Sequence, residues 1–127
     1  MFSVNSTIKL NMGVIRNLEK NAQKALEMTT DALLTEEKNA EVMPFDKGTL
    51  QNESTFSDFT NSSKGQTGIV SDTPYARRLY FHPEFNFSRD ENSAAGAQWH
   101  RYWQEGGTRE NFCVDTFAEI YRRLNRL

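Results

Sequence analysis

The chain has 127 residues, the size of one domain with a single core, and its formal net charge is −2. A charge this close to balance argues against binding to nucleic acid or to an anionic membrane through overall charge. Only 37% of the residues are hydrophobic but 12% are aromatic, so we expect a modest core rich in aromatic rings.

Cys113 is the only cysteine, which excludes a disulfide within the chain and favours a reducing compartment. The first residues lack the apolar run of a secretory signal. No stretch approaches the roughly 18–20 consecutive apolar residues that span a membrane. We therefore expect a protein that is soluble when made.

A long amphipathic helix is predicted over residues 12–38, after a segment (residues 1–11) that can be a strand or an arm. Asn11 can cap this helix, which at 1.5 Å per residue would be roughly 40 Å long. Its apolar face, with spacings of three and four, comprises Ile15, Leu18, Ala22, Ala25, Leu26, Thr29, Ala32 and Leu33. The opposite face is expected to be solvated and carries Arg16, Glu19, Lys20, Gln23, Lys24, Glu27, Asp31 and Glu37.

Turn residues follow this helix and lead into a hairpin. Pro44 cannot continue a helix, and Asp46 and Gly48 favour a turn. A short helical turn over residues 49–54 can follow. The two arms of the hairpin are predicted at residues 54–60 and 66–71, joined by the polar loop 61–65.

The stretch 71–81 connects this hairpin to a long loop at residues 82–98. Pro74 changes the direction of the chain, because proline fixes its own φ and disfavours helix in the residue before it. Three apolar side chains of the stretch can lie over the core, namely Tyr75, Leu79 and Phe81. Arg77 and Arg78 are expected to point elsewhere.

The long loop contains Phe85 and Phe87, which argue against plain disorder because disordered segments are poor in aromatic residues. Loops of this length are usually functional or disordered. Two interpretations remain open. Together with Phe81, these rings are buried either in the chain's own core or in a partner.

Two further helices are predicted after the loop. Residues 93–105 place Ala95, Trp99, Tyr102 and Trp103 on one side, and Gly106 and Gly107 end this segment. The last helix, residues 109–127, has an aromatic stripe that we expect to be core: Phe112, Val114, Phe117, Ile120, Tyr121 and Leu124. Its final turns carry Arg122, Arg123 and Arg126, which complement the helix dipole.

Catalytic and metal-binding patterns are weak in this sequence. The scattered glycines form no phosphate-binding loop, and one cysteine with two distant histidines cannot form a zinc site. Irregular spacing makes a metal site improbable at His82, Glu84, Asp90 and His100. Cys113 with His100 could act as nucleophile and base, but a small buried cysteine is the favoured interpretation. We therefore expect neither an enzyme nor a bound cofactor or metal.

Three segments, in this order, resemble minor capsid and head-to-tail joining proteins of tailed bacteriophages, which are similar to tail-completion proteins. The first segment (44–54) resembles a Pro-x-Asp-x-Gly-x-Leu pattern. The second (73–81) resembles a Thr-Pro-Tyr-Ala pattern followed by two aromatic residues. The third is the loop 85–89 followed by the segment that contains Trp99. These positions, expected to be structural, are Pro44, Asp46, Gly48, Leu50, Pro74, Tyr75, Ala76, Tyr80, Trp99 and Trp103.

The resemblance implies a single α+β domain in which a long N-terminal helix packs on a small, mainly antiparallel sheet. It also implies a structural virion protein of the head–tail connector, made in the bacterial cytoplasm and assembled as a ring, commonly six-fold. The implied partners are copies of itself, the portal or connector ring, and tail tube or terminator proteins. DNA is present only as the content of the channel, and neither a membrane nor a cofactor is implied.

Candidate assembly contacts under this hypothesis are Phe81, Phe85, Phe87, Arg77, Arg78, Asn61 and Lys64. One alternative is a small nucleic-acid-binding module that uses Arg77, Arg78 and the C-terminal arginines, with steeply salt-dependent binding. A further alternative is a hydrolase or nuclease that uses His82, His100 and nearby carboxylates.

Overall fold

The computed structural model describes residues 11–43, 55–73, 75–84, 87, 89, 92 and 94–126. Its elements are three helices, α1 (Met12–Asn39), α2 (Ala76–Tyr80) and α3 (Phe112–Asn125), two strands, β1 (Thr55–Asp58) and β2 (Gly68–Ser71), and two 3-10 turns, η2 (Ser62–Lys64) and η3 (Arg101–Trp103). The predicted α+β class, with a long N-terminal helix and a C-terminal helix, is confirmed. The segments 1–10 and 44–54, which include the expected turn after the first helix, lie outside the described residues.

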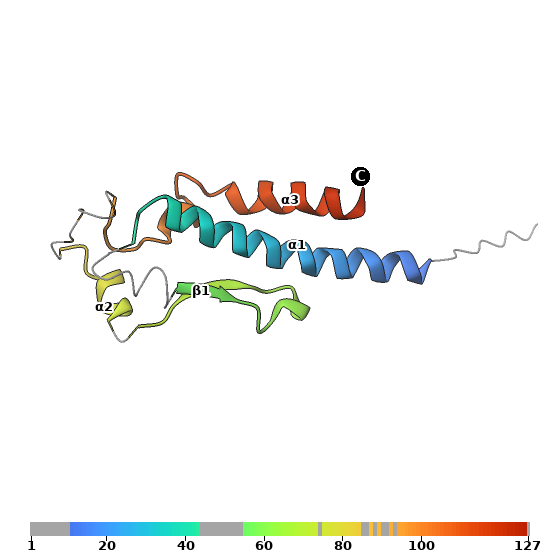
Figure 1. Cartoon of the computed structure of the whole chain (residues 1–127), viewed down its shortest axis with the longest axis horizontal. Helices are drawn as coiled ribbons and strands as arrows, with labels where there is room; N and C mark the ends of the chain where they lie inside the picture. Colours follow the sequence, from blue (N-terminus) through green and yellow to red (C-terminus); the bar gives the residue numbers. More distant parts are fainter. Residues whose placement is uncertain are drawn as a thin grey trace, which may run out of the picture.

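Helix α1 is the longest element, and it lies between the other two layers of the molecule (Figure 1). The Asn11 side chain accepts a hydrogen bond from the backbone N–H of Val14 at 3.2 Å and so caps the helix. Helix α3 packs along one side of α1 and the β1–β2 hairpin lies along the other. The start of α1 extends beyond these two layers, and Met12 and Val14 are exposed there. Leu18, which lies beside Tyr121 of α3, is also exposed.

Polar side chains hold the hairpin to α1. The hydroxyl groups of Thr30 and Thr67 are 2.6 Å apart, and Ser57 donates to the Asp31 carboxylate at 2.8 Å. Near the hairpin loop, Gln23 donates to the Ser62 hydroxyl at 3.2 Å. The contact between the hairpin and α1 is therefore largely polar, and most of the apolar core lies elsewhere.

The hairpin forms close to the predicted positions. The strands are antiparallel, with Thr55 opposite Ser71 and Asp58 opposite Gly68. The loop between them contains η2, which ends at Gly65, whose φ of 80° is the left-handed conformation that glycine adopts without strain. The outer face of the hairpin leaves Phe56 and Phe59 exposed.

The core lies at the C-terminal end of α1, where the chain meets α2. Its buried residues are Val42, Met43, Ala76, Trp99 and Trp103. Tyr80 packs its ring edge against Trp99, with the ring centroids 4.8 Å apart. Trp99 also donates its Nε1–H to the Ser71 hydroxyl at 3.3 Å, which ties the core to the hairpin.

The helix predicted over residues 93–105 does not form in the described residues 94–105, where only the 3-10 turn η3 (Arg101–Trp103) is present. The N–H groups of Ala94 and Gly96 bond to the carbonyls of Glu41 and Val42, and that of Gln98 bonds to Tyr80. These donors are used between distant segments, so they are not available for a helix. Trp99 and Trp103 are nevertheless buried, as the sequence suggested.

Helix α3 runs antiparallel to α1 (Figure 1). Asn21 donates to the Asn125 side chain at 2.7 Å at one end of the pair, and Arg109 forms an ion pair with Glu36 at 2.8 Å towards the other. No residue of α3 is fully buried. Most of the predicted aromatic stripe is therefore half-buried against α1. Val114 is 70% exposed, so its assignment to the core was wrong.

None of the helices in the described ranges is long and apolar enough to cross a membrane.

Candidate assembly site

Helix α2 presents one face to the core and the other to solvent. Positions 76, 79 and 80 are three or four residues apart and face inward, since 3.6 residues make one turn. Ala76 is buried, and Leu79 and Tyr80 pack against the core cluster. The remaining positions face outward, so Tyr75 is 44% exposed and Phe81 is 59% exposed. Tyr75 therefore does not lie over the core, and of the two interpretations left open for Phe81, burial in the chain's own core is wrong.

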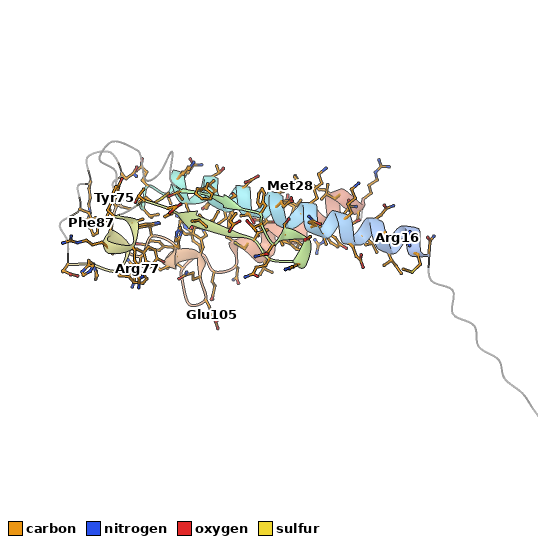
Figure 2. The ribbon with its side chains drawn as sticks, turned by 90° about the horizontal axis from the view of Figure 1, so that it is seen from below. Arg16, Met28, Tyr75, Arg77, Phe87 and Glu105 are labelled. Atoms are coloured by element: carbon orange, nitrogen blue, oxygen red, sulfur yellow. The ribbon has the colours of Figure 1, made fainter. Side chains whose placement is uncertain are left out.

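Arg77 and Arg78 are exposed on the same short helix, as predicted. Figure 2 shows Tyr75, Arg77 and Phe87 at one end of the molecule and Arg16 at the other. Phe87 is half-buried, while Phe85 lies outside the described residues, so the choice between core and partner stays open for that ring. Pro44, Asp46, Gly48, Leu50 and Pro74 also lie outside the described residues.

Asn61 and Lys64 are exposed in the hairpin loop. This loop is at the end of the hairpin that points away from α2 (Figure 1). The structure therefore does not bring them together with Phe81 and Arg77. If both groups are assembly contacts, they belong to two separate surfaces.

A pocket of about 200 Å³ opens beside α2. Its lining comes from the hairpin, α2 and the segment before η3: Ser71, Ala76, Arg77, Tyr80, Phe81, Trp99 and His100. The ring of Tyr80 lies between its neighbours, with centroids 5.1 Å from Phe81 and 5.5 Å from His100. The walls are thus mainly aromatic, and Ser71, Arg77 and His100 supply polar groups.

His100 is held in place by a buried carboxylate. Its Nδ1 lies 2.8 Å from Oε1 of Glu37, whose side chain is only 2% exposed, whereas that of His100 is 20% exposed. His100 lines the pocket and Glu37 does not, so the imidazole stands between the carboxylate and the pocket. Bonding at Nδ1 fixes the ring and leaves its other nitrogen for a ligand or partner.

Glu37 was wrongly assigned to the solvated face of the first helix. It lies four residues after Leu33, on the side of α1 that faces the core, and this spacing could have indicated its burial. Its second oxygen, Oε2, has no hydrogen-bond partner among the residues that the structure describes. A buried carboxylate with one unpaired oxygen is costly unless its charge is compensated.

Two neighbours of Glu37 are held in their protonated forms. Burial raises the pKa of the Tyr80 hydroxyl, and the charge of Glu37 raises it further. Burial likewise raises the pKa of the Cys113 thiol, again with a contribution from Glu37. A thiol with a raised pKa forms less thiolate at neutral pH, which argues against Cys113 as a nucleophile.

The other hypothetical catalytic residues lie apart. His82 and Glu84 form an exposed pair of their own at 2.6 Å, and the hydrogen bond with His82 lowers the pKa of Glu84. His100 pairs with Glu37 instead. Within the described ranges, no group of three or more His, Cys, Asp or Glu side chains is arranged to hold a metal ion. Asp90 lies outside those ranges.

Comparison of the chain with protein-family models, with curated proteins and with solved structures finds no match.

Proposed function

We propose that the chain is a structural subunit of the head–tail connector of a tailed bacteriophage or prophage, and that copies of it assemble into a ring. The resemblance of residues 44–54, 73–81 and 85–99 to minor capsid and tail-completion proteins supports this proposal. The α+β fold with its long N-terminal helix agrees with the fold that the resemblance implies. The partners would be neighbouring copies, the portal complex and tail proteins, and DNA would only pass through the channel.

The observation that carries the assembly part of the proposal is the set of exposed apolar side chains on separate parts of the chain. Tyr75 and Phe81 are exposed at one end, Met12, Val14 and Leu18 at the other, and α3 buries no residue completely. Exposed apolar surface of this kind marks interaction sites when it is gathered into patches. A ring needs two different patches on each subunit, one of which binds the other.

The nucleic-acid-binding alternative is less well supported by the placement of the arginines. Arg77 and Arg78 lie on α2, whereas Arg122, Arg123 and Arg126 lie at the C-terminal end of α3, towards the opposite end of the molecule. Arg123 also pairs with Glu119 on its own helix. A module that grips a nucleic-acid backbone would gather its cations on one face.

Measurement of the mass of the purified chain across a range of concentrations tests whether it assembles. We expect a species whose mass is a fixed multiple of the subunit mass and stays constant as concentration rises, because a ring closes and an open filament does not. Mass photometry at low concentration and light scattering at high concentration measure this. A monomer at every concentration, with and without a portal complex, would contradict the proposal.

A further inference from the structure

We propose that the pocket beside α2 binds the first turn of α3 of a second copy, with Val114 against Phe81 and Asp115 against Arg77. This inference rests on the proposed ring assembly and names the contact that closes it. The contact joins two surfaces, and the described residues of a single chain leave both of them uncovered.

The two apolar partners, Val114 and Phe81, are identified by the exposure of their side chains to solvent. Among the described residues, Val114 is the most exposed large hydrophobic side chain and Phe81 the next, at 70% and 59%. Phe81 forms one wall of the pocket, which Tyr80 and Trp99 extend inward. Transfer of these two side chains from water to a shared contact would be favourable, at roughly 25 cal/mol for each Å² of apolar area buried.

Opposite charges stand beside the two apolar side chains. Arg77 lines the pocket next to Phe81, and Asp115 follows Val114 in the first turn of α3. Neither Arg77 nor Asp115 forms an ion pair with any other residue in the described part of the chain. Each surface therefore consists of an exposed apolar group and an unpaired charge, and the two charges have opposite signs.

His100 adds a second polar group to the pocket. Its Nδ1 is occupied by Glu37, so the opposite edge of the ring is the part that remains for a partner. Successive residues of a helix are about 100° apart around its axis. Val114 can therefore enter between the aromatic walls while Asp115 reaches the polar rim formed by Arg77 and His100.

The two surfaces of one subunit cannot meet each other. Helix α3 lies on one side of α1, whereas α2 lies with the hairpin on the other side (Figure 1). The contact therefore joins different patches of two copies. A contact of this type is heterologous, and it generates a ring when the rotation between subunits closes.

Exchange of the two charges tests the inference. Arg77→Glu places Glu against Asp115, and Asp115→Arg places Arg against Arg77, so each variant alone is expected to need about 10-fold or more protein to assemble. An equimolar mixture of the two variants restores an opposite-charge pair at every contact. We expect the mixture to assemble within about 3-fold of the wild-type concentration, as measured by mass photometry.

Lys24→Glu is the matched control for the charge reversal, because Lys24 is exposed on α1 and does not line the pocket, and we expect it to assemble like the wild type. Melting curves show whether each variant is folded. Asp115→Asn and Arg77→Gln, which carry no reversed charge, provide a second pair of variants and should weaken assembly less.

If the wild type forms a ring and both reversed variants do so equally well, or if their mixture stays monomeric while folded, the inference is wrong and the proposed function stands. A wild type that never assembles contradicts the proposed function itself.

Discussion

Replacement of Trp99 by alanine should lower the free energy of unfolding by about 3–5 kcal/mol. Trp99 is fully buried in the core cluster, which has only five buried members among the described residues. It packs against Tyr80 and bonds to Ser71, so it joins α2, the hairpin and the segment before η3. Because domains of this size are stable by about 5–15 kcal/mol in total, the loss is large.

Urea unfolding, followed by tryptophan fluorescence from Trp103 or by circular dichroism, measures this loss. Phe81→Ala is the matched control. Phe81 is an aromatic residue close to Trp99 but is largely exposed, so its removal should change the stability by about 0.5 kcal/mol or less. Similar losses for the two variants would contradict this role of Trp99 in the core.

Replacement of His100 by alanine should cost about 3 kcal/mol at neutral pH. The substitution leaves the buried Glu37 carboxylate without the partner that lies 2.8 Å from its Oε1. Glu37→Gln should cost less, about 1 kcal/mol, because an amide oxygen can still accept a hydrogen bond from Nδ1–H while the buried charge is removed.

The double variant, His100→Ala with Glu37→Gln, tests the pairing of these two side chains more directly. In the His100→Ala background, Glu37→Gln removes the stranded charge, so the second substitution should raise the free energy of unfolding rather than lower it further. Denaturant titration of the four proteins measures the coupling. Strict additivity of the two losses would contradict the role assigned to the pair.

The long helix and the hairpin could be predicted because their determinants are local. Spacings of three and four over residues 12–38 and the polar loop 61–65 each specify an element without knowledge of the rest of the chain. The segment 94–104 could not be predicted in this way. Three of its N–H groups bond to carbonyls of Glu41, Val42 and Tyr80, and nothing within the segment itself indicates those partners.

The candidate site was only partly predictable for a related reason. Arg77 and Phe81 were identified from the stretch that contains them, but the pocket also needs Ser71 and His100 from other segments. The burial of Glu37 was missed because a charged residue in a polar run was taken as solvated. For Phe81 the sequence leaves core and partner open, because the face that a five-residue helix such as α2 turns inward depends on the segments that pack against it.

The proposed role in head–tail joining is tested most directly in a tailed phage or induced prophage that carries the gene for this chain. We expect inactivation of its gene to leave DNA-filled heads and separate tails, and we expect the wild-type gene, supplied from a plasmid, to restore tailed particles. The same plasmid carrying Arg77→Glu alone should fail, and co-expression of Arg77→Glu with Asp115→Arg should rescue. Negative-stain electron microscopy of lysates counts the three kinds of particle. Normal numbers of tailed particles without the gene would contradict the proposed function.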